Sequence, residues 1–139
     1  MSYKIIGKYI KNLNFCIPNA KTFFLLSKNI ENYKINIDIK SDQIKQHIIE
    51  VSTSLKLTPT REDLEKIDTN IVFTTIIELS KEQIGKQELE KIVLVDVPSK
   101  IYGELRGIFI NLFENSGFKD IKINENVDFQ KLYSTRKVQ

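Results

Sequence analysis

The sequence holds few of the residues from which active sites and metal centres are usually built. Its 139 residues include one cysteine, Cys16, one histidine, His47, and five glycines that are scattered singly. A lone cysteine excludes an internal disulfide and is typical of a reducing compartment, and scattered glycines cannot form a phosphate-binding loop. We interpret Cys16 as a small residue at a strand end and His47 as a surface or edge-strand residue. The sequence therefore predicts no enzyme, no cofactor and no metal.

Long apolar runs and a strong excess of one charge are also missing. The apolar runs around Ile76 and Ile108 are far shorter than the about 20 residues of a membrane span. The N-terminal segment lacks the apolar core of a secretory signal, so we expect a cytoplasmic protein. The net charge is +3, divided into +5 over residues 1–60 and −2 over residues 61–139. Nucleic-acid binders more often cluster arginine among aromatic residues, and only three arginines occur here.

Alternating apolar and polar residues predict extended segments in the first half of the chain. These segments cover residues 5–15, 33–40, 49–57 and 70–79. Pro18 and Asn19 end the first of them, because proline cannot continue a strand ladder and asparagine favours turns. Residues 21–29 are expected to form an unusually apolar crossing loop that carries Phe23 and Phe24.

The second half predicts helices. Pro98 suits the first turn of a helix, and Gly117 suits the left-handed conformation that ends one. Between them lies an apolar stripe at helical spacing: Ile101, Leu105, Ile108, Phe109, Leu112 and Phe113. Residues 118–123 are expected to return as a short extended segment, and Asp128 to cap a last helix. The chain is thus predicted to be one α+β domain, residues 1–139, with a four-stranded antiparallel sheet and with a long helix and a short C-terminal helix packed on one face.

A second face of the long helix is small and apolar. Gly103, Gly107 and Ile110 lie roughly opposite Leu105 and Leu112 on the helix. An exposed glycine inside a helix costs about 1 kcal/mol relative to alanine. Two such glycines are easier to explain if another helix packs closely against them. We predict that Gly103, Gly107 and Ile110 contact a second subunit.

Three blocks of sequence resemble the protein-export chaperone SecB family, in the family's order and over nearly the whole chain. Residues 9–20, YIKNLNFCIPNA, resemble its opening Tyr-x-Lys strand, which leads through Phe to a Pro-Asn/Ser-Ala turn. Residues 97–106, VPSKIYGELR, are similar to its Cys-Pro-x-x-Leu-Phe-Pro-Tyr-Ala-Arg helix start. Gly117-Phe118 followed by VDFQKLY at residues 127–133 resembles its Gly-Phe … Ile-Asn-Phe-x-x-Leu-Tyr ending.

This resemblance implies a homotetramer, a dimer of dimers assembled through the long helix. It also implies an ATP-independent holdase that keeps unfolded preproteins competent for Sec-dependent export and passes them to the SecA motor. A holdase needs apolar grooves that accept many sequences. The client-groove candidates are the matching positions Phe24, Ile67, Tyr102 and Tyr133, together with Phe23 beside Phe24.

The sequence also departs from the family. SecB chains are usually acidic, whereas the isoelectric point here is about 8.9. Where the family carries acids that meet SecA, this chain has Asn12, Cys16 and Asn70, and only about residues 134–139 remain for the tail that also docks the motor. Lost charge complementarity should weaken or redirect motor docking.

Three functions therefore stay open at the level of sequence. The first is the export chaperone that the resemblance implies. The second is a SecB-like chaperone for a dedicated client, such as an antitoxin, with little SecA contact. The third is a basic module that binds nucleic acid or an acidic protein through residues 1–60, where nine lysines outnumber four acids.

Overall fold

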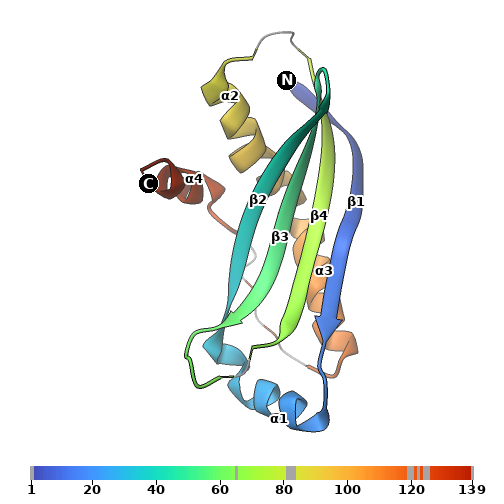
Figure 1. Cartoon of the computed structure of the whole chain (residues 1–139), viewed down its shortest axis with the longest axis vertical. Coiled ribbons are helices and arrows are strands. Elements are labelled where there is room, and N and C mark those ends of the chain that lie inside the picture. The colour runs from blue at the N-terminus through green and yellow to red at the C-terminus, as the bar shows by residue number, and fades with distance from the viewer. Residues whose placement is uncertain are drawn as a thin grey trace.

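A four-stranded antiparallel sheet forms one layer of the molecule (Figure 1). The computed structural model describes residues 2–64, 66–80, 84–118, 121, 123 and 126–138. The strands are β1 (Tyr3–Cys16), β2 (Tyr33–Lys45), β3 (Ile48–Pro59) and β4 (Asp68–Leu79), in the spatial order β1-β4-β3-β2. All four predicted strands are confirmed, and β1 and β2 lie at the edges of the sheet.

The two faces of the sheet differ as the alternation predicts. On the face covered by helices, Val51, Leu55 and Ile71 are completely buried. On the opposite face, here called the open face, cross-strand rows of polar residues are found, such as Asn14, Asn70 and Lys56. A sheet covered on one side is expected to show this pattern, because only one face can be removed from water.

Two irregularities in β1 redirect its side chains. The pairing with β4 shifts register between Ile5 and Gly7 and again between Ile10 and Asn12. Each bulge adds a residue and moves the following side chains to the other face. Tyr9 therefore lies opposite Thr74 on the open face, whereas Leu13 lies opposite Ile71 on the covered face.

The predicted crossing loop at residues 21–29 is wrong, because these residues form helix α1 (Ala20–Asn29). The Asn19 side chain caps this helix: its Oδ1 accepts the Thr22 backbone N–H at 2.8 Å and the Thr22 hydroxyl at 3.0 Å. Asparagine is as typical of a helix N-cap as of a turn. Burial of Thr22 and Leu26, four positions apart, fixes the inward side of α1.

The long helix begins where it is predicted, with Pro98 in its first turn, but it prolongs a helical run that starts before it. Helix α2 (Lys86–Lys91), a π-helical segment (Ile92–Asp96) and helix α3 (Val97–Asn115) follow one another without interruption. Pro98 thus lies within a helical run and has no N–H to donate. The wider π turn comes directly before it, where the Val97 N–H bonds to the Ile92 carbonyl. After α3, Gly117 has the predicted left-handed conformation, with φ of +95°.

The C-terminal part ends in helix α4 (Phe129–Val138). Its predicted cap is confirmed, since Asp128 Oδ1 accepts the Lys131 N–H at 2.9 Å. Of the predicted extended return at residues 118–123, Phe118, Ile121 and Ile123 belong to no strand, and Lys119, Asp120 and Lys122 lie outside the described residues.

The core between sheet and helices consists of two apolar clusters. The larger one packs the fully buried side chains of α3, Leu105, Phe109 and Phe113, on β3 and β4. The smaller one joins Tyr3 of β1 to the π-helical segment. Ile39 of β2 packs against both clusters. No helix in the described part of the chain is both long and apolar enough to cross a membrane.

Candidate functional site

An apolar pocket opens between the edge strand β2 and helix α4. Its volume is about 300 Å³, and we call it the β2–α4 pocket. It is lined by Ile35, Asn36, Ile37, Tyr102, Val127 and Leu132. A cavity of this size and composition can take an apolar side chain or a small apolar ligand.

Tyr102 is the aromatic residue in the wall of this pocket, and the ring of Phe129 packs against it. Tyr102 of α3 is almost wholly buried, and its ring lies 6.0 Å from that of Phe129, in an edge-to-face arrangement. Burial raises the pKa of the Tyr102 hydroxyl, and the nearby Arg106 lowers it by a smaller amount. Tyr102 is therefore a neutral, mostly apolar surface at physiological pH.

Helix α4 is attached to α2 by a hydrogen bond. The Tyr133 hydroxyl donates to Glu90 Oε2 at 2.9 Å. Leu132, the preceding residue, lines the β2–α4 pocket and is 46% exposed. The structure thus brings two of the predicted groove residues, Tyr102 and Tyr133, to the region where α4 meets the other helices.

A smaller pocket, the β2–α2 pocket, lies farther along β2. Its volume is about 240 Å³. It is lined by Ser41, Gln43, Ile49, Leu89, Glu90, Val93 and Leu94. Sequence reasoning missed it, because its residues come from two segments about 50 positions apart and carry no local signal.

The other groove candidates lie elsewhere. Phe23 and Phe24 are on α1, at the opposite end of the molecule from α2 (Figure 1). Phe24 is 68% exposed, whereas Phe23 is half-buried and its ring lies 4.8 Å from that of Phe118. Ile67 is buried in the larger apolar cluster. The five candidates therefore do not form one site in the subunit, and their contact with clients stays a prediction.

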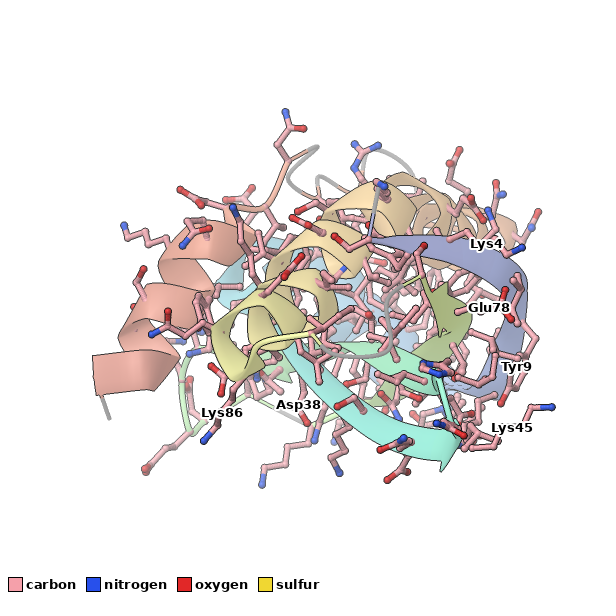
Figure 2. The ribbon with its side chains drawn as sticks, turned by 90° about the horizontal axis from the view of Figure 1, so that it is seen from above. Lys4, Tyr9, Asp38, Lys45, Glu78 and Lys86 are labelled. Carbon is pink, nitrogen blue, oxygen red and sulfur yellow. The ribbon has the colours of Figure 1, made fainter. Side chains whose placement is uncertain are left out.

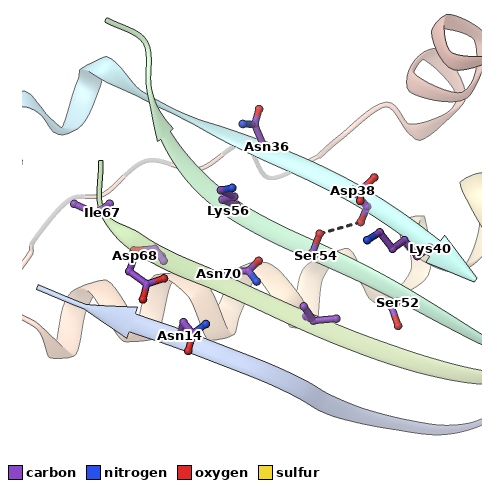
Figure 3. A pocket seen from close by; sticks show the side chains of 12 residues that line it. Asn14, Asn36, Asp38, Lys40, Ser52, Ser54, Lys56, Ile67, Asp68 and Asn70 are labelled. Carbon is purple, nitrogen blue, oxygen red and sulfur yellow. Dashed lines mark hydrogen bonds between the residues drawn. The ribbon is translucent and has the colours of Figure 1, made fainter. Parts of the chain in front are cut away.

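The open face of the sheet carries a broad polar groove with a volume of about 570 Å³. Asn14, Asn70, Lys56 and Asn36 form a row across all four strands of this face (Figure 3). Among the predicted motor-docking positions, Asn70 lies in this row and Cys16 pairs with Asp68 at the end of β1.

The third motor-docking position, Asn12, is exposed and pairs with Val72. All three positions thus lie at one end of the open face. Asp68 lines the polar groove beside them, and a second acid, Asp38 of β2, lines the same groove. The sequence does not reveal that Asp68 lies beside Cys16, because the two residues are 52 positions apart along the chain.

A polar cluster on the open face holds β1 to β3. The Tyr9 hydroxyl donates a hydrogen bond to Glu50 Oε1, and Lys11 Nζ lies 3.4 Å from the same atom. The hydrogen bond lowers the pKa of the Glu50 carboxyl and raises the pKa of the Tyr9 hydroxyl. Figure 2 shows Tyr9 on the β1 side of the molecule, where Lys4 and Glu78 form an ion pair of 3.2 Å.

The predicted subunit-contact face carries an unfilled surface. Gly103 is exposed and Gly107 half-buried, and a Cβ atom added at either glycine would meet no atom within 4 Å. Ile110 is half-buried against the larger apolar cluster. Packing within the described subunit therefore does not explain the two glycines, and the subunit contact stays a prediction.

An antiparallel sheet with an exposed edge strand and an apolar pocket beside it offers a surface on which a segment of polypeptide can lie. The chain belongs to the SecB family. The family model described as "Preprotein translocase subunit SecB" matches residues 1–139. The resemblance noted from three sequence blocks is thereby confirmed.

Curated relatives and a solved structure agree with this family. The chain is 42% identical to a "Putative protein-export protein SecB" of Pelagibacter ubique, over 97% of this chain and 96% of the relative. It is 22% identical to the "Protein-export protein SecB" of Anaplasma phagocytophilum, over 94% and 89% of the two chains. The fold is similar to "Mycobacterium tuberculosis Rv1957 SecB-like chaperone in complex with a ChAD peptide from Rv1956 HigA1 antitoxin", with a TM-score of 0.67, 10% identity, and coverage of 91% and 88%.

Proposed function

We propose that this protein is an ATP-independent holdase that binds unfolded preproteins and keeps them competent for export. The family assignment supports the function, and the β2–α4 pocket is the observation that supports a client-binding site at this place. An unfolded chain exposes apolar side chains, and each Å² of apolar surface removed from water contributes roughly 25 cal/mol. A pocket lined by Ile35, Ile37 and Leu132 can supply this affinity without reading a particular sequence.

The working form that we propose is a cytoplasmic homotetramer, a dimer of dimers. The unfilled surface at Gly103 and Gly107 supports a close helix contact between subunits. Assembly would place several β2–α4 pockets on one particle. A single unfolded chain could then bind at more than one pocket, which raises the overall affinity without new contacts.

The test is suppression of aggregation. A model protein diluted from denaturant should scatter less light in the presence of the wild-type chaperone. Leu132→Asp should lose most of this effect, because it puts a charge into the apolar pocket without disturbing a buried residue. The matched control is Gln130→Asp, which adds a charge to an exposed position of the same helix. Equal activity of the two variants would refute the assigned site.

A second candidate is a chaperone for a dedicated client with little SecA contact. The uncharged residues Asn12, Cys16 and Asn70 at the family's motor positions favour it. Surface plasmon resonance with immobilised cognate SecA separates the two candidates. Binding in the micromolar range or tighter supports export, whereas no binding together with intact aggregation suppression supports the dedicated client.

A further inference from the structure

Helix α1 turns apolar side chains toward the solvent at one end of the molecule. Thr22 and Leu26 form its buried side, whereas Phe24 and Leu25 are exposed. Among the large hydrophobic side chains that the structure describes, that of Phe24 is the most exposed. Figure 1 shows α1 lying across the end of the molecule, beyond the ends of the four strands. Single apolar residues are normal on a protein surface, whereas neighbouring ones on a projecting element indicate a partner.

Two lysines complete the outward side of α1. Lys21 comes three positions before Phe24, and Lys28 comes three positions after Leu25. Residues at this spacing lie on one face of a helix. We call the four residues the α1 stripe. Both lysines are exposed, and within the described part of the chain neither takes part in an ion pair. Their charges are therefore available to a partner.

The segment that contains α1 has no acid to balance these lysines. Residues 1–30 hold five lysines and neither aspartate nor glutamate, and Glu31 is the first acid in the chain. A one-signed cluster of charge produces a local potential that attracts partners of the opposite sign. The α1 stripe thus combines exposed apolar side chains with positive charge, and its partner should be both apolar and anionic.

The shape of this end of the molecule favours a flat partner over a peptide. Residues of α1 line neither the β2–α4 pocket, nor the β2–α2 pocket, nor the polar groove of the open face. A peptide is bound where a groove or a strand edge covers its side chains and backbone, and a projecting helix offers only one side. A lipid surface needs no groove, because the lipids themselves surround each side chain that enters them.

We propose that the α1 stripe docks on an anionic lipid surface, with Phe24 and Leu25 among the acyl chains and with Lys21 and Lys28 at the headgroups. This inference goes beyond the proposed function and concerns a surface apart from the client pocket. Lysine suits the boundary, because its apolar stem lies along the acyl region while its ammonium group stays in water. Docking of this kind brings a chaperone that carries a preprotein to the membrane across which the client is exported.

The first test is co-sedimentation of the wild-type protein with lipid vesicles. One preparation contains equal parts of phosphatidylcholine and anionic phosphatidylglycerol, and the other contains phosphatidylcholine alone. The wild type should bind the anionic vesicles more tightly, by about fivefold for each lysine of the stripe, and added salt should weaken this binding. The double variant Lys21→Gln/Lys28→Gln should lose the preference. The matched control, Lys40→Gln/Lys45→Gln, removes the same charge from exposed positions of β2 and should keep it.

A single tryptophan on α1 reports insertion into lipid directly, because the chain contains none. Phe24→Trp keeps a large aromatic side chain at the outward position. Its emission should shift to shorter wavelength when anionic vesicles are added, and brominated lipids should quench it. Ile44→Trp is the matched control, because Ile44 is also largely exposed and lies beside the β2–β3 turn, at the end of the sheet opposite α1. Its emission should stay unchanged.

Leu25→Ser tests the apolar part of the stripe. This variant should bind anionic vesicles about fivefold more weakly, because less apolar surface leaves the water. It should keep the particle mass and the aggregation suppression of the wild type, because Leu25 is exposed and lines none of the three pockets.

Three results would overturn the inference, and each is distinct from failure of the proposed function, which aggregation suppression by the wild type measures separately. Equal binding of the wild type to both kinds of vesicle, or binding to neither, refutes an anionic lipid surface as the partner. Loss of aggregation suppression by Leu25→Ser with unchanged vesicle binding assigns the stripe to clients. A smaller particle for Leu25→Ser in light scattering assigns the stripe to a contact between copies.

Discussion

Glu50 is an acidic residue on the open face with only 11% of its side chain exposed. Tyr9 and Lys11 of β1 bring a hydroxyl and an ammonium group to one oxygen of its carboxylate. Hydrogen bonds to the charged form favour ionisation, and this effect outweighs the loss of hydration on burial. The cluster fixes β1 against β3 across the intervening strand β4.

The lowered pKa of Glu50 makes stability depend on pH. A carboxyl group with a lowered pKa in the folded state stabilises the fold above its unfolded pKa, near 4.5, and this contribution is lost as the pH falls through the folded value. Urea unfolding should therefore show that Glu50→Gln is less stable than the wild type at pH 7, and that the difference shrinks below about pH 4.

The raised pKa of the Tyr9 hydroxyl makes the stability of the fold depend on pH in the alkaline range. It stabilises the fold below pH 10 and the contribution is lost as the pH rises through the raised value. Tyr9→Phe should therefore match the pH 7 loss of Glu50→Gln in direction. A constant difference between wild type and Glu50→Gln from pH 7 to about pH 3 would contradict the assigned cause of the Glu50 shift.

At the scale of elements, helix α1 depends on its cap. Asn19 satisfies the Thr22 N–H, one of the donors left free at a helix start. Asn19→Ala should lower the free energy of unfolding by about 1 kcal/mol. Asn19→Ser, which keeps a capping oxygen, should lose only a few tenths. Urea titration measures both, and a loss shared equally by the two variants would show that the side chain acts other than as a cap.

The sequence predicts the strands better than the helices, and the reason is physical. The run from Tyr33 to Lys40 alternates strictly, and burial follows this alternation in β2. In α1, Phe23, Phe24, Leu25 and Leu26 are consecutive, so the apolar residues do not mark one face, and Asn19 reads equally well as a turn residue. Only packing on the core decides which of them is buried.

The helix start and the groove show a second limit of the sequence. Pro98 is a valid start signal, but the preceding π segment lets the helix continue through it. The family resemblance identifies Tyr102 and Tyr133 as groove candidates. The β2–α2 pocket cannot be found in this way, because it forms only where Ser41 and Leu94, which are distant in the sequence, lie close together in the fold. Sites assembled from distant segments appear only when register and helix placement are known.

At the scale of the whole molecule, the glycine face of α3 is the place where assembly is expected. Because a Cβ at Gly103 or Gly107 meets nothing within 4 Å, a leucine at either position fits the isolated subunit. Leucine also favours helix over glycine, by up to about 1 kcal/mol. Each substitution should therefore leave the subunit folded. Between subunits the same leucine would keep the two helices apart, because the distance between packed helices depends on the size of the side chains at the contact.

Gly103→Leu and Gly107→Leu should consequently break the proposed tetramer into smaller, folded species. Multi-angle light scattering gives the mass, and circular dichroism verifies the fold. Asn115→Leu is the matched control, because it adds a leucine to an exposed position of α3 away from the glycines. If the glycine variants keep the wild-type mass and unfold at a higher temperature, the face is free surface, and the assembly must use a different contact. Loss of the tetramer together with weaker aggregation suppression would show that holding a client needs several pockets on one particle.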